Sequence, residues 1–273
     1  MPNRTRPLAF VLASTDHGTM LVNRFDRRML GPTKGFGVGY QLLERAAYEP
    51  IEVHMLLQLL DLRRTYYGDG IVAVDCGANV GVHTIEWAKH MTGWGAVLAF
   101  EAQQRIYYAL AGNIAINNCF NAQAVHTAVA SRPGLMKIPQ PNYLVAASFG
   151  SLELKKRPNT EFIGQAIDYD DESKMVAVQT VTIDSYNLPR LDLLKIDIEG
   201  MELDALAGAA GCIRANRPII FVEKLKTDPA QLRAWLEAAD YSVFDIGANF
   251  LAVNNADKCL AEIKVVPATA SAA

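Results

Sequence analysis

The stretch IVAVDCGANVGVHTIEWAKH, residues 71–90, decides the fold. It opens with a short apolar run, passes through a turn bounded by Gly77 and Gly81, and ends with apolar side chains at helical spacing. We therefore predict a buried strand over 71–75 and a helix over 82–91. The two glycines let the backbone turn tightly and approach a ligand, while the first helical turn presents free N–H groups. This arrangement suits a cofactor that contains a nucleoside.

The turn differs from the GxGxxG fingerprint of dinucleotide-binding proteins. Asn79 stands where the second glycine would let the backbone approach a pyrophosphate, so a cofactor without a pyrophosphate fits better. Glu101 follows at the end of the next apolar run. A carboxylate there can accept hydrogen bonds from both hydroxyls of a ribose. The turn and Glu101 together predict one nucleoside site.

Short apolar runs alternate with helical patterns from residue 71 onward, as in a parallel sheet with crossover helices. The sequence therefore predicts an α/β fold. Strands are expected over 71–75, 96–101, 124–130, 191–197 and 217–223, and helices over 82–91, 103–117, 201–215 and 229–239.

Several of these strands end in acidic residues. Because ligands of such sheets bind at the carboxyl ends of the strands, we expect these carboxylates to share one rim. They are Asp75, Glu101, Asp197 and Glu223.

A second copy of the turn motif, DIGAN at residues 245–249, has a different context. An alternating run precedes it and another apolar run follows it, with no helix to receive a ligand. That pattern is typical of a β-hairpin. We interpret it as an ordinary turn and not as a second site.

Two further regions depart from the alternation. Residues 1–70 are expected to form an N-terminal cap that includes a Gly-rich segment and an amphipathic helix at 50–67. The main domain is predicted over 71–262, followed by a disordered tail at 263–273. An insertion at 131–181 is too long for a simple crossover, and long insertions often cover binding sites. Its strand-like runs lie at 134–139, 148–155 and 175–183.

Composition narrows the class of protein. The chain has 273 residues, 51% of them hydrophobic, and a formal net charge of −3. That charge argues against a nucleic-acid partner, since binding phosphates needs a strongly basic surface. No apolar run approaches the ~20 residues that span a bilayer, and the N-terminus lacks the pattern of a signal peptide. The four cysteines form no CxxC pair, which predicts buried reduced thiols and a cytoplasmic location.

With these motifs in hand, the chain resembles the FkbM family of S-adenosylmethionine-dependent methyltransferases. The resemblance implies a Rossmann-like seven-stranded methyltransferase sheet, mostly parallel with one antiparallel strand and with helices on both faces. One departure is Ala102, where the family usually has proline after the ribose acid. The likeness covers roughly residues 49–223 and is carried by VDCGANVG (74–81), AFEAQQRIYYALAGNIAINN (99–118), VQTVTIDSY (178–186), LLKIDIEGMELDALAGA (193–209) and RPIIFVE (217–223).

The resemblance also implies roles for single residues. Glu101 would hold the ribose of S-adenosylmethionine, and Gln103 would neighbour the adenosine. Asp197 and Glu199 would lie beside the sulfonium and its reactive methyl group. The methionine part of the cofactor would be surrounded by Asp75, Gly77, Asn79 and Gly81. The family is associated with O-methylation of hydroxyls on polyketides, sugars and glycans, so a small-molecule or glycan acceptor is expected.

A hydroxyl that attacks a methyl group must lose its proton to a nearby base. We predict that Asp197, Glu199 or Glu223 supplies the base, and Glu202, His83 and His126 are further candidates. Crowded carboxylates raise one another's pKa values, whereas Lys195 would oppose this effect.

The same three acids, Asp197, Glu199 and Glu223, could hold a divalent metal, because hard cations favour clustered carboxylates. We favour chemistry without a metal, since no tight DxD spacing supports an ion.

The sequence is also compatible with two other classes of function. A nicotinamide-dependent oxidoreductase would also need a glycine turn and a ribose acid, although Asn79 counts against it. A non-catalytic scaffold or sensor could keep the cofactor fold. Exposed apolar residues on the helix at 50–67 could support a homodimer.

Overall fold

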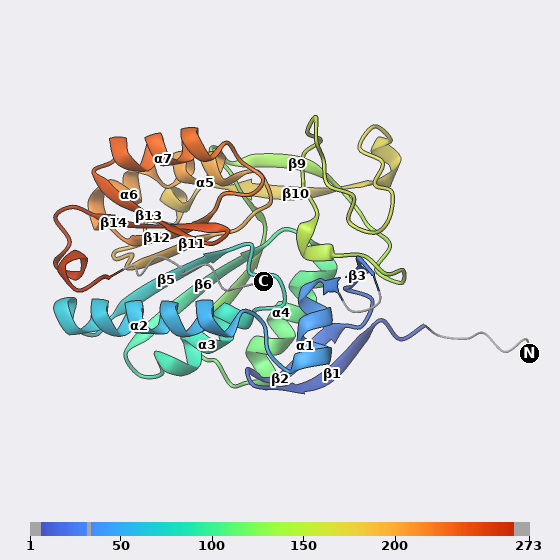
Figure 1. Ribbon diagram of the computed structural model, residues 1–273, viewed down its shortest axis with the longest axis horizontal. Coiled ribbons are helices and arrows are strands. Elements are labelled where there is room, and N and C mark those ends of the chain that lie inside the picture. The colour runs from blue at the N-terminus through green and yellow to red at the C-terminus, as the bar shows by residue number, and fades with distance from the viewer. Residues whose placement is uncertain (1–6, 32–33, 265–273) are drawn as a thin grey trace, which may run out of the picture.

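The fold is built on one twisted seven-stranded sheet (Figure 1). A computed structural model describes residues 7–31 and 34–264. The strand order is β13-β14-β12-β11-β5-β6-β7, and every strand is parallel to its neighbours except β14. This confirms the predicted α/β sheet. The strands span Ile71–Cys76 (β5), Gly95–Glu101 (β6), Ala122–His126 (β7), Leu193–Ile196 (β11), Ile219–Glu223 (β12), Tyr241–Ile246 (β13) and Asn249–Asn254 (β14).

Helices cover both faces of this sheet, as predicted (Figure 1). Successive side chains of a strand point to opposite faces, so neighbouring residues join different cores. In β5, Ala73 packs in the core beneath one face, while Val74 packs in the core beneath the other. The first face is covered by α2 (Pro50–Tyr67), α3 (Val82–His90) and α4 (Gln104–Ile116), and the second by α5 (Glu202–Gly208), α6 (Ala210–Asn216) and α7 (Pro229–Ala238).

The second DIGAN turn is a hairpin, as expected. Gly247 has a φ of 56° and connects β13 to β14, which pair in antiparallel register. No helix follows this turn directly, because β14 begins at Asn249. The second DIGAN motif therefore forms the turn of the hairpin between β13 and β14.

Two predicted elements are each divided in the structure. The helix expected over 201–215 was wrong as a single element, since α5 ends and α6 begins on either side of Ala209. The carboxylate of Asp184 accepts hydrogen bonds from the N–H groups of Gly211 and Cys212, so α6 starts with its own acceptor. Periodicity of apolar residues alone does not reveal such a break.

The strand expected over 124–130 is likewise divided at Thr127. Its first part is β7 of the main sheet, whereas β8 (Ala128–Val129) turns away and pairs with β10 (Met175–Val181). The hydroxyl of Thr127 donates to the carbonyl of Gln179 at 2.6 Å, which fixes the chain where it changes sheets.

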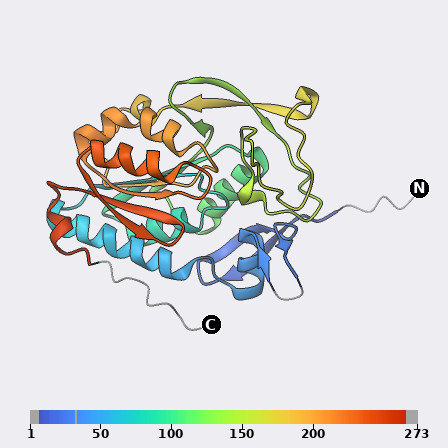
Figure 2. The same ribbon diagram turned by 45° about the horizontal axis from the view of Figure 1, so that its top comes forward.

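The insertion forms a three-stranded sheet and a long irregular segment. The sheet has the order β8-β10-β9, with β9 at Gly134–Pro139 antiparallel to β10. The strand-like run at 148–155 is not a strand, because Phe149–Ser151 forms a 3-10 turn and the following residues are irregular. Figure 2 shows this irregular segment beside the N-terminal part of the chain. An isolated parallel bridge between Asp26 and Ala147 joins the two regions.

The N-terminal part contributes two hairpins and two helices. Helix α2 confirms the helix predicted at 50–67. Met20 and Val22 of β2 are fully buried in the same core as the sheet residues. The remaining elements are β1 (Phe10–Thr15), β2 (Gly18–Asn23), β3 (Arg28–Met29), β4 (Gly35–Phe36) and α1 (Val38–Arg45).

Three other expectations can be compared with the described residues. All four cysteines are buried and free, as predicted. No helix in the described ranges is both long and apolar enough to cross a membrane. The tail predicted at 263–273 lies outside the described residues from position 265 onward.

Candidate functional site

One cavity of about 250 Å³ opens at the carboxyl edge of the sheet. Residues of the sheet, the N-terminal part and the insertion all line it. The turn after β5 and the ends of β6, β11 and β12 form its floor, which is the edge where parallel sheets bind ligands. The acids predicted to share a rim meet here, with one exception, and that exception is Asp75.

Gly77 brings the backbone closer to the neighbouring strand than any other residue type could. Its φ is 80°, and a Cβ atom at this position would lie 1.8 Å from the carbonyl oxygen of Asp197. Its N–H donates to the carbonyl of Phe100 at 3.0 Å. Gly77 therefore lets the turn cross between β6 and β11 while lining the cavity.

Asn79 and Gly81, at the end of the turn, lie differently relative to the cavity. Asn79 has a φ of 52° and lines the cavity. Gly81, with a φ of 93°, precedes α3 and lies behind the cavity wall, where a Cβ would meet Leu110 at 2.6 Å. Gly81 thus shapes the turn through packing against α4 and is not among the lining residues.

Asp75 lies beneath the cavity and does not line it. Its side chain is fully buried, and it accepts a hydrogen bond from the Thr84 hydroxyl at 2.7 Å. The ammonium of Lys195 lies 3.6 Å from its other oxygen. Asp75 therefore lies at the carboxyl edge of the sheet, as predicted. Its contacts with Thr84 and Lys195 hold it beneath the cavity.

Glu101 joins the turn to the end of β6. Its carboxylate accepts hydrogen bonds from the N–H groups of Asn79 at 3.0 Å and Gln103 at 2.7 Å. Burial, opposed by these two hydrogen bonds, raises the pKa of Glu101 to about 7. The carboxylate lines the cavity with both oxygens held in place.

Gln103 connects the end of β6 with the insertion. Its amide donates to the carbonyl of Phe149 at 2.9 Å and accepts from the Tyr143 hydroxyl at 3.0 Å. Both partners belong to the insertion, so Gln103 helps to hold that segment over the end of β6.

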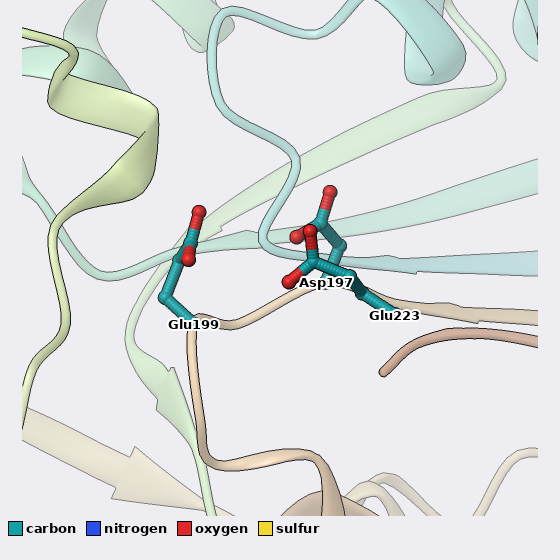
Figure 3. A group of neighbouring side chains, drawn as sticks. All are labelled: Asp197, Glu199 and Glu223. Carbon is teal, nitrogen blue, oxygen red and sulfur yellow. The ribbon is translucent and has the colours of Figure 1, made fainter. Parts of the chain in front are cut away.

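Asp197, Glu199 and Glu223 form a cluster at the other end of the cavity (Figure 3). Each offers a carboxylate oxygen within 4.8 Å of the others. Asp197 follows β11, and Glu223 is the last residue of β12. Glu199 has a φ of 57°, a left-handed conformation that turns the chain after β11.

The pKa values of two members of this cluster, Glu199 and Glu223, are raised. Burial and the charge of Asp197 raise the pKa of Glu199 to about 8, and the ammonium of Lys226 opposes that shift. Burial and repulsion from Asp197 and Glu199 raise the pKa of Glu223 to about 9. Because both pKa values lie above 7, these two carboxyls hold protons at neutral pH and become proton acceptors as the pH rises.

Lys195 lies between the buried support and the cluster. Its ammonium is 3.6 Å from Asp75 and 3.4 Å from Asp197. Burial alone would lower the pKa of Lys195, but the two carboxylates outweigh burial and raise it. The cation that opposes the raised pKa values of Glu199 and Glu223 is Lys226, so the effect predicted for Lys195 on these two acids comes from a different lysine.

The other candidate bases have separate positions. The buried carboxylate of Glu202 accepts from the N–H groups of Ile198 and Gly200 at 3.2 and 3.0 Å, so it fixes the loop after β11 from behind the wall. His126 lies 3.1 Å from the carbonyl of Ala102 and does not line the cavity. His83 does line it.

The imidazole of His83 lies 3.1 Å from the carboxylate of Glu52 on α2. Asn249, from the hairpin turn, donates to the same carboxylate at 3.1 Å. The second DIGAN turn thus supports the cavity indirectly. Its Asn249 holds Glu52, and Glu52 contacts His83 on the cavity wall.

Sequence patterns did not identify the residues that the N-terminal part and the insertion bring to the cavity. Their segments carry only indirect signals, a glycine-rich run at 31–40 and a loop of unusual length at 131–181. Long-range contacts place them, and no spacing rule reports such contacts. They are Phe36, Gly37, Val38, Gln41, Tyr48, Glu49, Ser148, Gly150, Ser151, Leu152 and Leu154.

Comparison with known proteins adds a family match over the same region. Residues 75–243 match the family model described as the methyltransferase FkbM domain. Methyltransferase sdnD of Sordaria araneosa is 30% identical over 155 residues, which cover 50% of this chain and 59% of that protein. The chain thus spans less than two thirds of that relative's length.

Solved structures with related folds share little sequence with this chain. A methyltransferase FkbM from Methylobacillus flagellatus KT has a TM-score of 0.47 at 16% identity, over 70% of this chain and 47% of that one. The tRNA (uracil-54, C5)-methyltransferase of Pyrococcus abyssi, in complex with S-adenosyl-L-homocysteine, has a TM-score of 0.43 at 13% identity, over 92% and 45% of the two chains.

Proposed function

The chain belongs to the methyltransferase FkbM family, and from that membership we propose that it is an S-adenosylmethionine-dependent methyltransferase that acts on a hydroxyl group. The family match argues against the nicotinamide-dependent oxidoreductase and the non-catalytic scaffold. The observation that carries the proposal is the cavity with Glu101 at one end and the acidic cluster at the other.

The residues present fit the cofactor. Glu101 lines the cavity with oxygens that can accept from ribose hydroxyls, and Gln103 lies beside it. Gly77 leaves room where any side chain would meet the carbonyl of Asp197, and Asn79 completes the turn. Asp75 and Gly81 would act from behind the wall, Asp75 through Lys195 and Gly81 through the shape of the turn.

S-adenosylmethionine supplies a methyl group already activated by a positively charged sulfur. The protein then has to align the acceptor oxygen, exclude water and remove one proton, and alignment alone can supply several kcal/mol. We propose that Asp197, Glu199 and Glu223 receive that proton as a group. The raised pKa values of Glu199 and Glu223, about 8 and about 9, support this role, because they make each carboxylate a stronger proton acceptor once it is ionised.

We propose that the reaction uses no metal. The ammonium of Lys226 lies 2.6 Å from a Glu199 oxygen, so the cluster already contains a cation. The acceptor is proposed to be a small molecule, a sugar or glycan, or a polyketide. Cytoplasmic location is proposed from the four free buried cysteines. A homodimer through α2, where Ile51 is 87% exposed, remains a prediction that light scattering would check.

Isothermal titration of S-adenosylmethionine and S-adenosylhomocysteine tests the cofactor site. We expect micromolar binding to the wild type and at least tenfold weaker binding to Glu101→Ala, which is about 1.4 kcal/mol. Absence of binding to the folded wild type would overturn the proposal.

Once an acceptor is found, the variants Asp197→Asn, Glu199→Gln and Glu223→Gln identify the base. Each retains shape but removes a carboxylate that can take a proton. We expect at least one variant to lower kcat by a hundredfold or more, in the range that a general base contributes. Three variants with unchanged kcat would contradict the role of the cluster.

A further inference from the structure

Lys226 has three oxygen partners although its side chain is only 12% exposed. Its ammonium donates to the carbonyl of Ser151 at 2.8 Å, and it lies 3.0 Å from the carboxylate of Glu161 and 2.6 Å from that of Glu199. The ammonium of Lys226 thus has as many oxygen acceptors as it has N–H donors, which leaves the group fully used.

The three partners come from two regions of the chain. Ser151 and Glu161 are in the irregular segment of the insertion, and Ser151 lines the cavity. Glu199 is in the acidic cluster after β11, whereas Lys226 follows β12. A single side chain thus connects the segment above the cavity to the cluster on its floor.

The connection continues towards the N-terminal part. Arg28 of β3 donates to the carboxylate of Glu161 at 2.8 Å. The order Arg28, Glu161, Lys226, Glu199 is therefore an unbroken series of alternating charges from the protein surface to the cavity.

Most surface ion pairs contribute little, because water screens both charges and ordering the side chains costs entropy. Lys224 is such a case, since its partner Asp245 is 61% exposed and belongs to the hairpin. Lys226 differs from it in the lower exposure of its partners, in the number of those partners and in facing the cavity cluster. Lys224, two residues away, is consequently a matched control.

We propose that Lys226 is a positioning residue for methyl transfer: it fastens the segment 148–163 over the reacting end of the cavity and fixes the orientation of Glu199. The role in methyl transfer rests on the proposed function. Fastening the segment is a property of the chain alone, so it can be measured without a cofactor. No bond to the reacting atoms is assigned to Lys226.

Hydrogen exchange measured by mass spectrometry tests the fastening in the full chain. In Lys226→Met we expect amides within 148–163 to exchange at least tenfold faster than in the wild type, with exchange in β5 and β11 unchanged. Lys224→Met should match the wild type. Lys226→Arg should recover rates to within threefold, since it retains a charged donor.

A second variant, Glu161→Gln, keeps the proposal testable if Lys226→Met fails to fold. Glu161→Gln removes one exposed partner and leaves the contact between Lys226 and Glu199 in place. We expect faster exchange in 148–163 here also, smaller than in Lys226→Met. Wild-type rates in both variants, or equal effects in Lys224→Met, would overturn the proposal.

Dissociation of S-adenosylhomocysteine, measured by surface plasmon resonance, tests the link to the cofactor. A fastened segment slows escape, so Lys226→Met should raise the dissociation rate at least fivefold and Lys226→Arg should restore it. If the wild type fails to bind while local exchange still responds, the proposed function is wrong and the fastening stands. Normal dissociation together with normal exchange in Lys226→Met would mean that Lys226 positions nothing.

Discussion

The N–H of Asn79 donates a hydrogen bond of 3.0 Å to the carboxylate of Glu101, joining the turn after β5 to the end of β6. This hydrogen bond fixes the direction of the Glu101 carboxyl group. The N–H of Asn79 finds an acceptor there whether Glu101 is ionised or protonated. Glu101 is consequently both a structural partner of the turn and the proposed partner of the ribose.

Cofactor affinity should depend on pH through this residue. Burial raises the pKa of Glu101 to about 7, and ribose hydroxyls prefer the ionised carboxylate as acceptor. We expect binding of S-adenosylhomocysteine to strengthen by about tenfold from pH 6 to pH 8, following ionisation of one group. Calorimetry checks this. Glu101→Gln should bind more weakly, and a pH dependence equal to that of the wild type would assign the titration to another group.

The same pKa has a consequence for the ligand-free protein. Because the folded state holds a proton above pH 4.5 that the unfolded chain releases, the contribution of Glu101 to stability falls as pH rises from about 4.5 to about 7. Urea unfolding at both pH values should show a smaller decrease in Glu101→Gln than in the wild type. An equal decrease would contradict the assignment.

Substitution of Gly77 by alanine should damage fold and site together. The Cβ would lie 1.8 Å from the carbonyl oxygen of Asp197, in a left-handed conformation. We expect a loss of at least ~3 kcal/mol in unfolding free energy and no measurable cofactor binding. Gly93 has nearly the same φ, 83°, with open space around it, so Gly93→Ala should cost only about 1 kcal/mol. Similar losses in the two variants would show that close approach is unimportant.

Arg63 should be essential for stability and irrelevant to cofactor binding. It is buried between Asp192, at 3.0 Å, and Asp257, far from the cavity lining. Removing it leaves the buried carboxylate of Asp257 without a cationic partner, while Asp192 keeps Arg190, so Arg63→Met should cost about 3 kcal/mol. Arg64→Met, which breaks an exposed pair with Asp69, should cost ~1 kcal/mol or less. Denaturant titration compares the two, and a small effect at Arg63 would refute the importance of the buried pair.

We expect Asn113 to couple the hairpin of β1 and β2 to the turn between β5 and α3. Its fully buried amide donates to the carbonyl of Val80 at 2.7 Å and exchanges hydrogen bonds with the backbone of Leu21. Asn113→Ala leaves these groups without partners and should lower stability by about 2–4 kcal/mol. Asn117→Ala, one turn later in the same helix region, should have a much smaller effect because its amide is partly exposed. Equal thermal shifts in both variants would argue against coupling.

Local sequence patterns were sufficient for the sheet and for one end of the cavity. The apolar runs of β5 and β6 and the glycines of the turn lie within about thirty residues of sequence, and hydrophobic periodicity reports such local patterns. Asp75 shows where this reasoning fails, because its burial depends on Lys195, which lies far away in sequence.

The breaks at Thr127 and Ala209 were not predictable for a related reason. Each is set by hydrogen bonds to another segment: Thr127 donates to the carbonyl of Gln179, and the N–H groups that follow Ala209 donate to the carboxylate of Asp184. The roles of Tyr48 and Ser151 as lining residues likewise follow from packing between regions that have no common period.

The antiparallel strand β14 has a consequence for synthesis on the ribosome. It pairs with β12 on one side and β13 on the other, although both precede it in the chain. Until residues 249–254 have emerged, β12 is an open edge that can pair with a neighbouring nascent chain. Glu223 pairs with Asn249 at the end of that edge, so the surroundings of the acidic cluster are completed only after residues 249–254 have emerged.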